Sequence, residues 1–565
     1  MKRWVWAGLA GVLALAVAMR FLPLWQYALW GSDSGEYFFL TDRLVGTSAI
    51  STDYGGWGFG YPYFPGMFIL TGEVRLLTGI PLLQSMQWAA PFAASLSVLM
   101  IFLITVRTFD DERAGLLAGG LLAVVTPAVY ATSHAMPGSV GDLLALLCVL
   151  LLLRSLESRA ALVGLGLASA ALVMTHHLST FFVLIPVAFT LLGRELVRVS
   201  TNRRRTAIEG GYVLCLLSGT MLYWYAYATP FRERVIPEGF GVSPWTVLAL
   251  AYAAMLAIPL LVWLRRRLAP GARYRATFPS VRRVAMFTAV FVVAGAAVLA
   301  AIALGVTPGT SIDLDDRAAF WFLPILGALA LAIGGIGRAE FSRDGFFVEL
   351  WMGAIAITML FGIATSNHVL LPYRQTQYFI APMAVLLGAG AVFLHDSWNP
   401  EGKRAASVAA AVALSALVVA SALTSYPPRE MMGGFEEGTA SDEMDGVLWL
   451  REEGRPAELV ATDHRLSSIV FGFSGLNASW DDARDTLHGT LSEARAEMAG
   501  LETPSGLHGV TLVLLSPTVE AGAALTQWET ALPIKGEALS KFSSEQYLRI
   551  YESNGVRVFR TNPGA

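Results

Sequence analysis

The chain has 565 residues, of which 55% are hydrophobic and only 15% are charged, and its formal net charge is −3. A soluble domain carries about 25% charged residues, so this composition excludes an ordinary soluble protein, and the slightly acidic balance indicates no nucleic-acid partner. Apolar runs of roughly 18 residues or more recur as far as Thr424, and each is long enough to cross a bilayer. The sequence therefore predicts a polytopic α-helical membrane protein.

About thirteen membrane-spanning helices are expected. They lie near residues 4–29, 84–107, 114–134, 138–156, 160–176, 178–194, 207–228, 244–264, 284–306, 319–336, 348–366, 375–395 and 405–424. The first begins with Lys2 and Arg3, like a signal peptide. Its apolar run continues past Arg20 without a clear small-residue cleavage site, so we expect an uncleaved first helix.

Arginine-rich loops predict the orientation of these helices. The clusters 203–205 and 265–267, and Arg338 further on, follow the sixth, eighth and tenth spans, on the same side as Lys2. Loops rich in Lys and Arg are cytoplasmic by the positive-inside rule. We therefore expect the first long loop, 30–83, and the C-terminal part of the chain to lie on the outer face.

The C-terminal part, residues 425–565, differs in charge and pattern from the membrane domain, residues 1–424. It contains 21 acidic and 11 basic residues, and the rest of the chain has 22 acidic and 29 basic ones. A helix is expected at 444–451, short buried strands at 458–462 and 510–515, and a hairpin at 549–560 around the turn pair Asn554-Gly555. This pattern predicts a small extracytoplasmic α/β domain.

The first outer loop opens with a short polar stretch that contains Asp33 and Glu36 and continues into the Gly/aromatic run 54–66. Two carboxylates three residues apart share a face if the stretch is helical. Such a pair at the mouth of a membrane segment could hold a divalent cation or serve as a catalytic base. The alternative is that both acids simply face water.

Three further polar residues lie at the outer ends of early spans. Asp142 precedes the apolar part of the fourth span, where it could contribute to a cation site with Asp33 or act only as a helix N-terminal acid. His176 and His177 lie between the fifth and sixth spans, where they could bind a metal or a phosphate. The alternative for the histidines is a hydrogen bond to a neighbouring helix end.

Another polar turn lies between the eleventh and twelfth spans. It contains His368, Tyr373 and Arg374. The Arg374 guanidinium at this depth could bind a lipid phosphate through two parallel hydrogen bonds. The alternative is an arginine whose side chain extends to the membrane interface.

Together these features resemble the GT-C glycosyltransferases, integral membrane enzymes that use polyprenyl-phosphate-linked sugars. The layout is similar to the catalytic subunit of oligosaccharyltransferase and its prokaryotic relatives, which also have thirteen spans and a soluble C-terminal domain. The resemblance implies that Asp33 is the catalytic acid of the first loop, with Glu36 beside it. It also implies that Asp142 is a metal-binding acid for Mg²⁺ or Mn²⁺, and that Arg374 holds the lipid phosphate with Tyr373 and His368 nearby.

The C-terminal domain departs from the oligosaccharyltransferase pattern. Those enzymes carry a Trp-Trp-Asp-Tyr-Gly motif that binds the acceptor, and the matching strand here reads Leu-Val-Ala-Thr-Asp-His-Arg from Leu459 to Arg465. Asp463 is retained and is followed by His464, but both tryptophans are missing. Asp142 is followed by Leu143 and Leu144 instead of an acidic neighbour.

The expected function is transfer of a sugar or oligosaccharide from a polyprenyl-phosphate-type donor to a lipid, glycan or protein acceptor. The expected location is the outer face of a prokaryotic plasma membrane, in contact with membrane lipids. One alternative is a divergent oligosaccharyltransferase that acts on protein asparagine. Another is a lipid-linked sugar flippase or transporter, which should show internal repeats and broken spans in matching halves.

Overall fold

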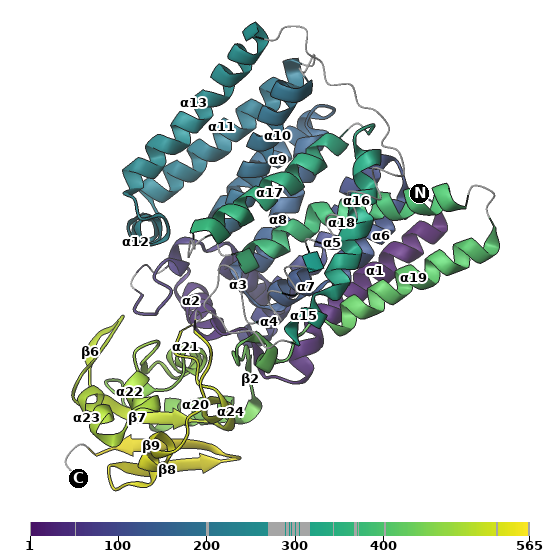
Figure 1. Cartoon of the computed structure of the whole chain (residues 1–565). Coiled ribbons are helices and arrows are strands. Elements are labelled where there is room, and N and C mark those ends of the chain that lie inside the picture. Colours follow the sequence, from purple (N-terminus) through teal and green to yellow (C-terminus); the bar gives the residue numbers. More distant parts are fainter. Residues whose placement is uncertain are drawn as a thin grey trace.

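The computed structural model describes residues 2–50, 52, 54–198, 203–268, 317–342, 344–365, 370, 372–399, 403–526 and 529–562, with single positions at 289, 293, 295, 296, 300 and 304. Residues before Ser425 form a helical part and those after it form a smaller domain with a sheet (Figure 1). The helices of the first part are α1 (Arg3–Phe21), α2 (Ser34–Thr47), α3 (Gly66–Thr78), α4 (Leu82–Ser95), α5 (Ser97–Phe109), α6 (Glu112–Val124), α7 (Thr126–Ser133), α8 (Pro137–Arg154), α9 (Arg159–Thr175), α10 (His177–Gly193), α11 (Arg203–Ala226), α12 (Thr229–Phe240), α13 (Pro244–Leu268), α15 (Ala318–Trp321), α16 (Leu323–Ala339), α17 (Gly345–Thr365), α18 (Pro372–Trp398) and α19 (Arg404–Leu423).

The multi-pass architecture is confirmed, but the number of thirteen spans is not. Within the described ranges, eight helices are long and apolar enough to cross a membrane, or nine if α6 and α7, bent by 57° at their junction, form one span. Helices α9 and α16 occupy two of the other predicted spans but are shorter. Helix α11 (Arg203–Ala226) covers most of the predicted span 207–228, and its charged start and Glu209 lower its mean hydropathy. The predicted span 284–306 lies mostly outside the described residues.

Helix α18 lies in the middle of the helical part. It packs against α5, α6, α16 and α17, and its residues Met383 to Leu386 are completely buried. By contrast, α13 and α19 expose large apolar side chains such as Leu250 and Val412. In a membrane protein such faces meet lipid tails, which are as apolar as leucine. The buried α18 is therefore well placed to hold a polar group in a fixed position.

The C-terminal domain contains a five-stranded mixed sheet in the order β4-β3-β7-β9-β8. Strands β4 (Asn477–Ala478), β3 (Leu459–Ala461) and β7 (Val510–Leu515) are parallel, while β9 (Val556–Thr561) and β8 (Tyr547–Ser553) add antiparallel. Helix α20 (Ser441–Glu453) and the β8–β9 hairpin confirm the predicted helix and hairpin. Asn554 and Gly555 have φ of 48° and 83°, as the predicted tight turn requires.

The remaining elements of this domain are short. They are β2 (Gly438–Thr439), α21 (His464–Ile469), the π-helical turn η5 (Val470–Ser474), α22 (Arg484–His488), α23 (Leu491–Ala499), the hairpin β5 (Leu501–Thr503) and β6 (Gly506–His508), α24 (Pro517–Ala521) and α25 (Glu537–Ser540). Apolar side chains of these elements and of the loops between them, including Leu466 and Trp480, are buried in the core of the domain. The predicted α/β domain is confirmed.

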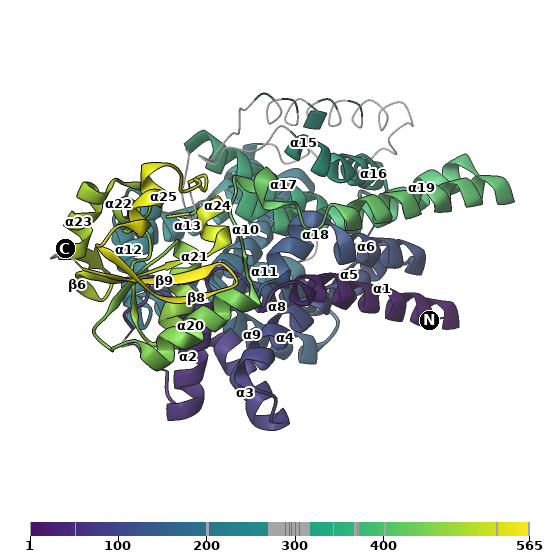
Figure 2. The same ribbon diagram turned by 90° about the horizontal axis from the view of Figure 1, so that it is seen from below.

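The first long loop, residues 30–83, is joined to the C-terminal domain at two places. Strand β1 (Leu29–Trp30) pairs antiparallel with β2, and α2 packs against α21 and η5. The second contact is very close, because a Cβ on Gly35 would lie 1.9 Å from the Ser468 carbonyl oxygen and a Cβ on Gly472 would lie 2.1 Å from the Gly35 carbonyl oxygen. Both views show the yellow-green domain at one end of the helices, beside α2 (Figure 1, Figure 2).

Candidate active site

Asp33 lies where the first loop meets the C-terminal domain. It is the N-cap residue of α2, but its side chain makes no capping hydrogen bond. Instead, Oδ2 accepts hydrogen bonds from the Tyr61 hydroxyl at 2.7 Å and the Tyr37 hydroxyl at 3.3 Å. The side chain is 17% exposed, so the carboxylate is partly open to solvent.

His464 approaches the same carboxylate from the C-terminal domain. Its Nε2 atom lies 3.9 Å from Asp33 Oδ1, and its Nδ1 atom lies 2.5 Å from Asp481 Oδ1. The Trp57 indole N–H donates to Asp481 Oδ2 at 3.0 Å, and the Trp57 ring meets the His464 ring edge to face at 4.9 Å. Residues from the loop and from the domain therefore form one polar cluster around Asp33.

The charges in this cluster favour ionised forms. Burial acts to raise the pKa of Asp33, but His464, Tyr61 and Arg374 outweigh it, so the pKa lies below its ordinary value. Burial likewise acts to lower the pKa of His464, but the Asp33 and Asp481 carboxylates raise it to about 10. The Asp33 carboxylate is thus available as an anion at neutral pH.

Glu36 differs sharply from Asp33, although only three residues separate them. Its side chain is completely buried, and Oε1 accepts hydrogen bonds from the Tyr54 hydroxyl and, at 2.8 Å, from the Gly58 backbone N–H. Burial, and then the charge of Asp33, raise the pKa of Glu36 to about 8. The two acids therefore face different surroundings, and only Asp33 is open to a substrate.

The raised pKa of Glu36 gives a pH-dependent stability that can be measured. The folded protein binds this proton more tightly than the unfolded chain, whose glutamates titrate near 4.5. The stabilising contribution is therefore fully present below about pH 4.5 and is lost as the pH rises through about 8. Glu36→Gln should remove this loss, which is on the order of a few kcal/mol.

Thermal unfolding in detergent at about pH 5, 7 and 9 would test this expectation. The melting temperature of the parent should fall more steeply with pH than that of Glu36→Gln. Glu73→Gln, at an exposed position on α3, is the matched control and should follow the parent. Equal slopes for the parent and Glu36→Gln would contradict the assignment of a protonated Glu36.

Arg374 is half-buried in the first turn of α18. It interacts electrostatically with Asp33 and with both His176 and His177. Its guanidinium therefore lies within reach of groups from the first loop and from the start of α10. Tyr373 belongs to the same helical turn, and His368 lies outside the described residues.

The two histidines have different surroundings. His176 is the N-cap residue of α10, and its Nδ1 atom accepts from the Ser179 backbone N–H at 3.3 Å and lies 2.8 Å from the Ser179 hydroxyl. His176 therefore caps the start of its own helix, α10, and the predicted metal or phosphate role of the two histidines stays a prediction. The His177 ring packs between Phe64, at 5.2 Å, and Phe231, at 4.6 Å.

Asp142 faces a cavity inside the helical part instead of the loop that carries Asp33. It is the sixth residue of α8, beyond the first turn, so it is not a helix N-terminal acid. Its Oδ1 atom accepts from the Ser179 hydroxyl at 3.3 Å, and its charge interacts with Arg20. The cavity has a volume of about 40 Å³, enough for a few water molecules.

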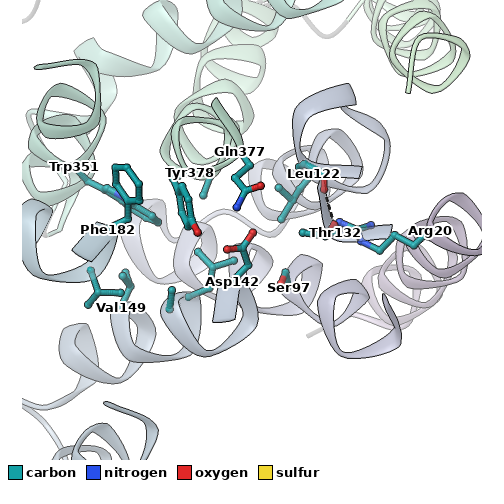
Figure 3. A pocket seen from close by; sticks show the side chains of 15 residues that line it. Arg20, Ser97, Leu122, Thr132, Asp142, Val149, Phe182, Trp351, Gln377 and Tyr378 are labelled. Carbon is teal, nitrogen blue, oxygen red and sulfur yellow. Dashed lines mark hydrogen bonds between the residues drawn. The ribbon is translucent and has the colours of Figure 1, made fainter. Parts of the chain in front are cut away.

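Arg20 lies on the other side of this cavity. It is 1% exposed, and its Nε atom donates to the Thr132 hydroxyl at 2.9 Å. Figure 3 shows Asp142 with Tyr378 and Gln377 on one side, and Arg20 with Thr132 on the other. A charged residue at membrane depth is costly unless it has a partner. Tyr426 and Asp142 are the groups that interact electrostatically with Arg20.

The acidic and histidine side chains around these clusters do not form a group of metal ligands in the part of the chain that the structure describes. In these ranges no three His, Cys, Asp or Glu side chains are grouped so that they could hold a metal ion. Asp33 and Asp142, the expected pair of ligands, belong to separate hydrogen-bond networks. The described residues therefore do not form a divalent-cation site between Asp33 and Asp142. The Mg²⁺ or Mn²⁺ site remains a prediction from the sequence.

Asp463 serves the local fold of the C-terminal domain. It is the N-cap residue of α21, where its Oδ1 accepts from the Leu466 backbone N–H at 2.9 Å. The next two residues make different contacts. His464 faces Asp33. Arg465 forms a buried pair with Glu443 through two hydrogen bonds of 2.8 and 2.9 Å. The cap therefore fixes the start of the helix that carries His464.

Sequence reasoning missed several members of these clusters. Tyr61 and Trp57 lie in the Gly/aromatic run, which we noted without assigning a role to its side chains. Arg20 could have been found, because a charged residue inside an apolar span is by default functional or paired. Asp481 carried no signal of its own in the sequence.

Comparisons with known proteins bear on the fold. No protein-family model matches the chain, and no curated protein does. Among solved structures, the archaeal oligosaccharyltransferase AglB from Archaeoglobus fulgidus, in complex with an inhibitory peptide and a dolichol-phosphate, matches with a TM-score of 0.60 and 13% identity, over 99% of this chain and 74% of that one. The Archaeoglobus fulgidus oligosaccharyltransferase in complex with Zn and sulfate matches with a TM-score of 0.58 and 15% identity, over 98% and 73% of the two chains.

A third match comes from another enzyme. The arabinofuranosyltransferase AftD from Mycobacteria matches with a TM-score of 0.51 and 12% identity, over all of this chain and 40% of that longer one. At such low identity the likeness concerns the fold, and it extends over the helical part and the C-terminal domain together. The resemblance drawn from the sequence is confirmed at this level: the chain has the fold of the GT-C glycosyltransferases.

Proposed function

We propose that this protein is a membrane glycosyltransferase that transfers a sugar or oligosaccharide from a polyprenyl-phosphate-type donor to an acceptor on the outer face of the membrane. The observation that carries the proposal is Asp33, a partly exposed carboxylate where the first loop meets the C-terminal domain in a GT-C fold. The dolichol-phosphate in complex with AglB supports a lipid-phosphate donor. The arginine-rich loops on the side of Lys2 support the outward orientation.

In the proposed reaction, Asp33 takes the proton from the acceptor group as that group attacks the anomeric carbon of the donor sugar. The bond between this carbon and the phosphate oxygen breaks, and the lipid phosphate leaves with the electron pair. Arg374, whose charge acts on Asp33, stabilises the leaving phosphate. Attack from the side opposite to the leaving group inverts the anomeric configuration.

The test is incubation of the purified protein with radiolabelled polyprenyl-phosphate sugars and three acceptors: a lipid alcohol, a glycan and a peptide with an Asn-X-Thr sequon. Product bound to any acceptor, lost in Asp33→Asn, supports a glycosyltransferase. Product bound to the peptide alone favours the divergent oligosaccharyltransferase. Movement of the intact donor across liposomes without product would favour the flippase and overturn the proposal.

Arg374→Lys should weaken use of the donor more than it weakens the fold. A lysine keeps the charge but cannot make two parallel hydrogen bonds to a phosphate. A charged hydrogen bond contributes about 1.5–3 kcal/mol, so kcat/KM for the donor should fall by roughly 10- to 100-fold.

Steady-state kinetics with varied donor, together with melting temperatures, would measure the effect. Arg404→Lys, at the exposed start of α19, is the matched control and should leave both quantities unchanged. Unchanged donor kinetics in a well-folded Arg374→Lys variant would rule out the phosphate role.

A further inference from the structure

The C-terminal domain contributes a buried histidine to the surroundings of Asp33. His464 is the first residue of α21, and its backbone N–H donates to the Ala524 carbonyl at 2.9 Å. Its side chain is completely buried. Helix α21 packs directly on α2, the helix that Asp33 caps. The position of the ring is therefore set by the fold of one domain and directed at a residue of the other.

The His464 ring is held on several sides. Asp481 binds Nδ1 at 2.5 Å, while Trp57 packs edge to face on the ring and donates its own N–H to Asp481 at 3.0 Å. Trp480 adds a second edge-to-face contact at 6.3 Å. A carboxylate bound to one imidazole nitrogen fixes the orientation of the ring and so the direction of the other nitrogen.

The other nitrogen points at Asp33. Nε2 is buried, makes no hydrogen bond, and faces Asp33 Oδ1 at 3.9 Å. A buried polar atom without a hydrogen-bond partner is rare in folded proteins. The other oxygen of Asp33, Oδ2, is held by Tyr61 and Tyr37. The first loop thus holds Oδ2, while Oδ1 faces the His464 ring of the C-terminal domain.

We propose that His464 is a positioning residue for Asp33, supplied by the C-terminal domain and held in place by Asp481 and Trp57. The inference rests on the proposed function, in which Asp33 takes the acceptor proton. Nε2 of His464 orients the Asp33 carboxylate, so the C-terminal domain completes the site where the acceptor reacts. A purely structural histidine would need only its contact with Asp481.

Two substitutions separate these roles. The side-chain amide nitrogen of His464→Gln lies as many bonds from Cβ as Nε2, so this variant keeps a donor toward Asp33. The amide nitrogen of His464→Asn corresponds to Nδ1, so this variant keeps only a group toward Asp481. His508→Gln, at a half-exposed position on β6 where Nε2 lies 3.4 Å from the Ser505 carbonyl oxygen, is the matched control.

We expect His464→Asn to lower kcat by roughly 10- to 100-fold, because a small displacement of a catalytic group can cost about that much. His464→Gln should recover most of the loss, His508→Gln should match the parent, and KM for the donor should stay within about twofold for all three variants. Equal loss in the Gln and Asn variants, or a larger loss in the Gln variant, would overturn the proposal. A parallel rise in donor KM and fall in melting temperature would also overturn it, since both indicate a structural role.

Melting temperatures test the contact between His464 and Asp33 without any enzyme turnover, so they can contradict this inference even if the proposed function is correct. Melting temperatures of Asp33→Asn, His464→Gln, His464→Asn and the two double variants form two double-mutant cycles. Coupling between Asp33→Asn and His464→Asn that shrinks in the Gln cycle supports the contact, even if no donor tested is turned over. Additive changes in both cycles would exclude the contact, whatever the enzyme does.

Discussion

Asp33→Asn should abolish most glycosyl transfer while leaving the fold intact. Asparagine has nearly the same size and can still accept hydrogen bonds from Tyr61 and Tyr37, but it cannot take a proton from the acceptor. Loss of a general base costs about 10²- to 10⁴-fold in rate. Turnover at saturating donor and acceptor, with melting temperature measured alongside, would give both parts of the result.

Glu36→Gln is the matched variant for this experiment, because it removes a carboxyl group three residues away on the same helix. Its effect on turnover should be much smaller, since the Glu36 side chain is completely buried and meets Tyr54 and Gly58 rather than solvent. Turnover of Asp33→Asn at the rate of the parent, or a larger loss in Glu36→Gln, would show that the catalytic acid is misassigned.

Arg20→Met should strongly destabilise the helical part. Arg20 and Asp142 lie on opposite sides of one cavity inside the helical part and interact electrostatically (Figure 3). Removing one partner of a buried pair costs about 3–5 kcal/mol, because the remaining charge is left without compensation. The melting temperature in detergent should therefore fall clearly, and more than for Arg3→Met at the exposed start of the same helix.

The double variant Arg20→Met with Asp142→Leu tests the pairing itself. When both charges are replaced by apolar side chains, no uncompensated charge remains, so the double variant should be more stable than either single one. A double variant at least as unstable as the sum of the single changes would contradict the pairing and would favour a separate role for Asp142, such as the predicted cation site.

The sequence by itself determined the class of the protein and many of its local elements. Long apolar runs can be accommodated only as helices in a bilayer, so the membrane domain followed from composition and length. The β8–β9 hairpin followed from the Asn554-Gly555 pair, because few residues tolerate the positive φ that its turn requires. Asp33 was predictable because it directly follows the first apolar run.

The tertiary structure decided the partners of these residues. His464 meets Asp33, and Arg20 faces Asp142, through packing of elements that are distant in the chain, and no local pattern encodes such contacts. The same reason explains why Asp33 and Glu36, neighbours in sequence, differ in role. Folding leaves the Asp33 carboxylate partly exposed and buries Glu36. Burial raises the pKa of Glu36, whereas His464, Tyr61 and Arg374 hold the pKa of Asp33 below its ordinary value.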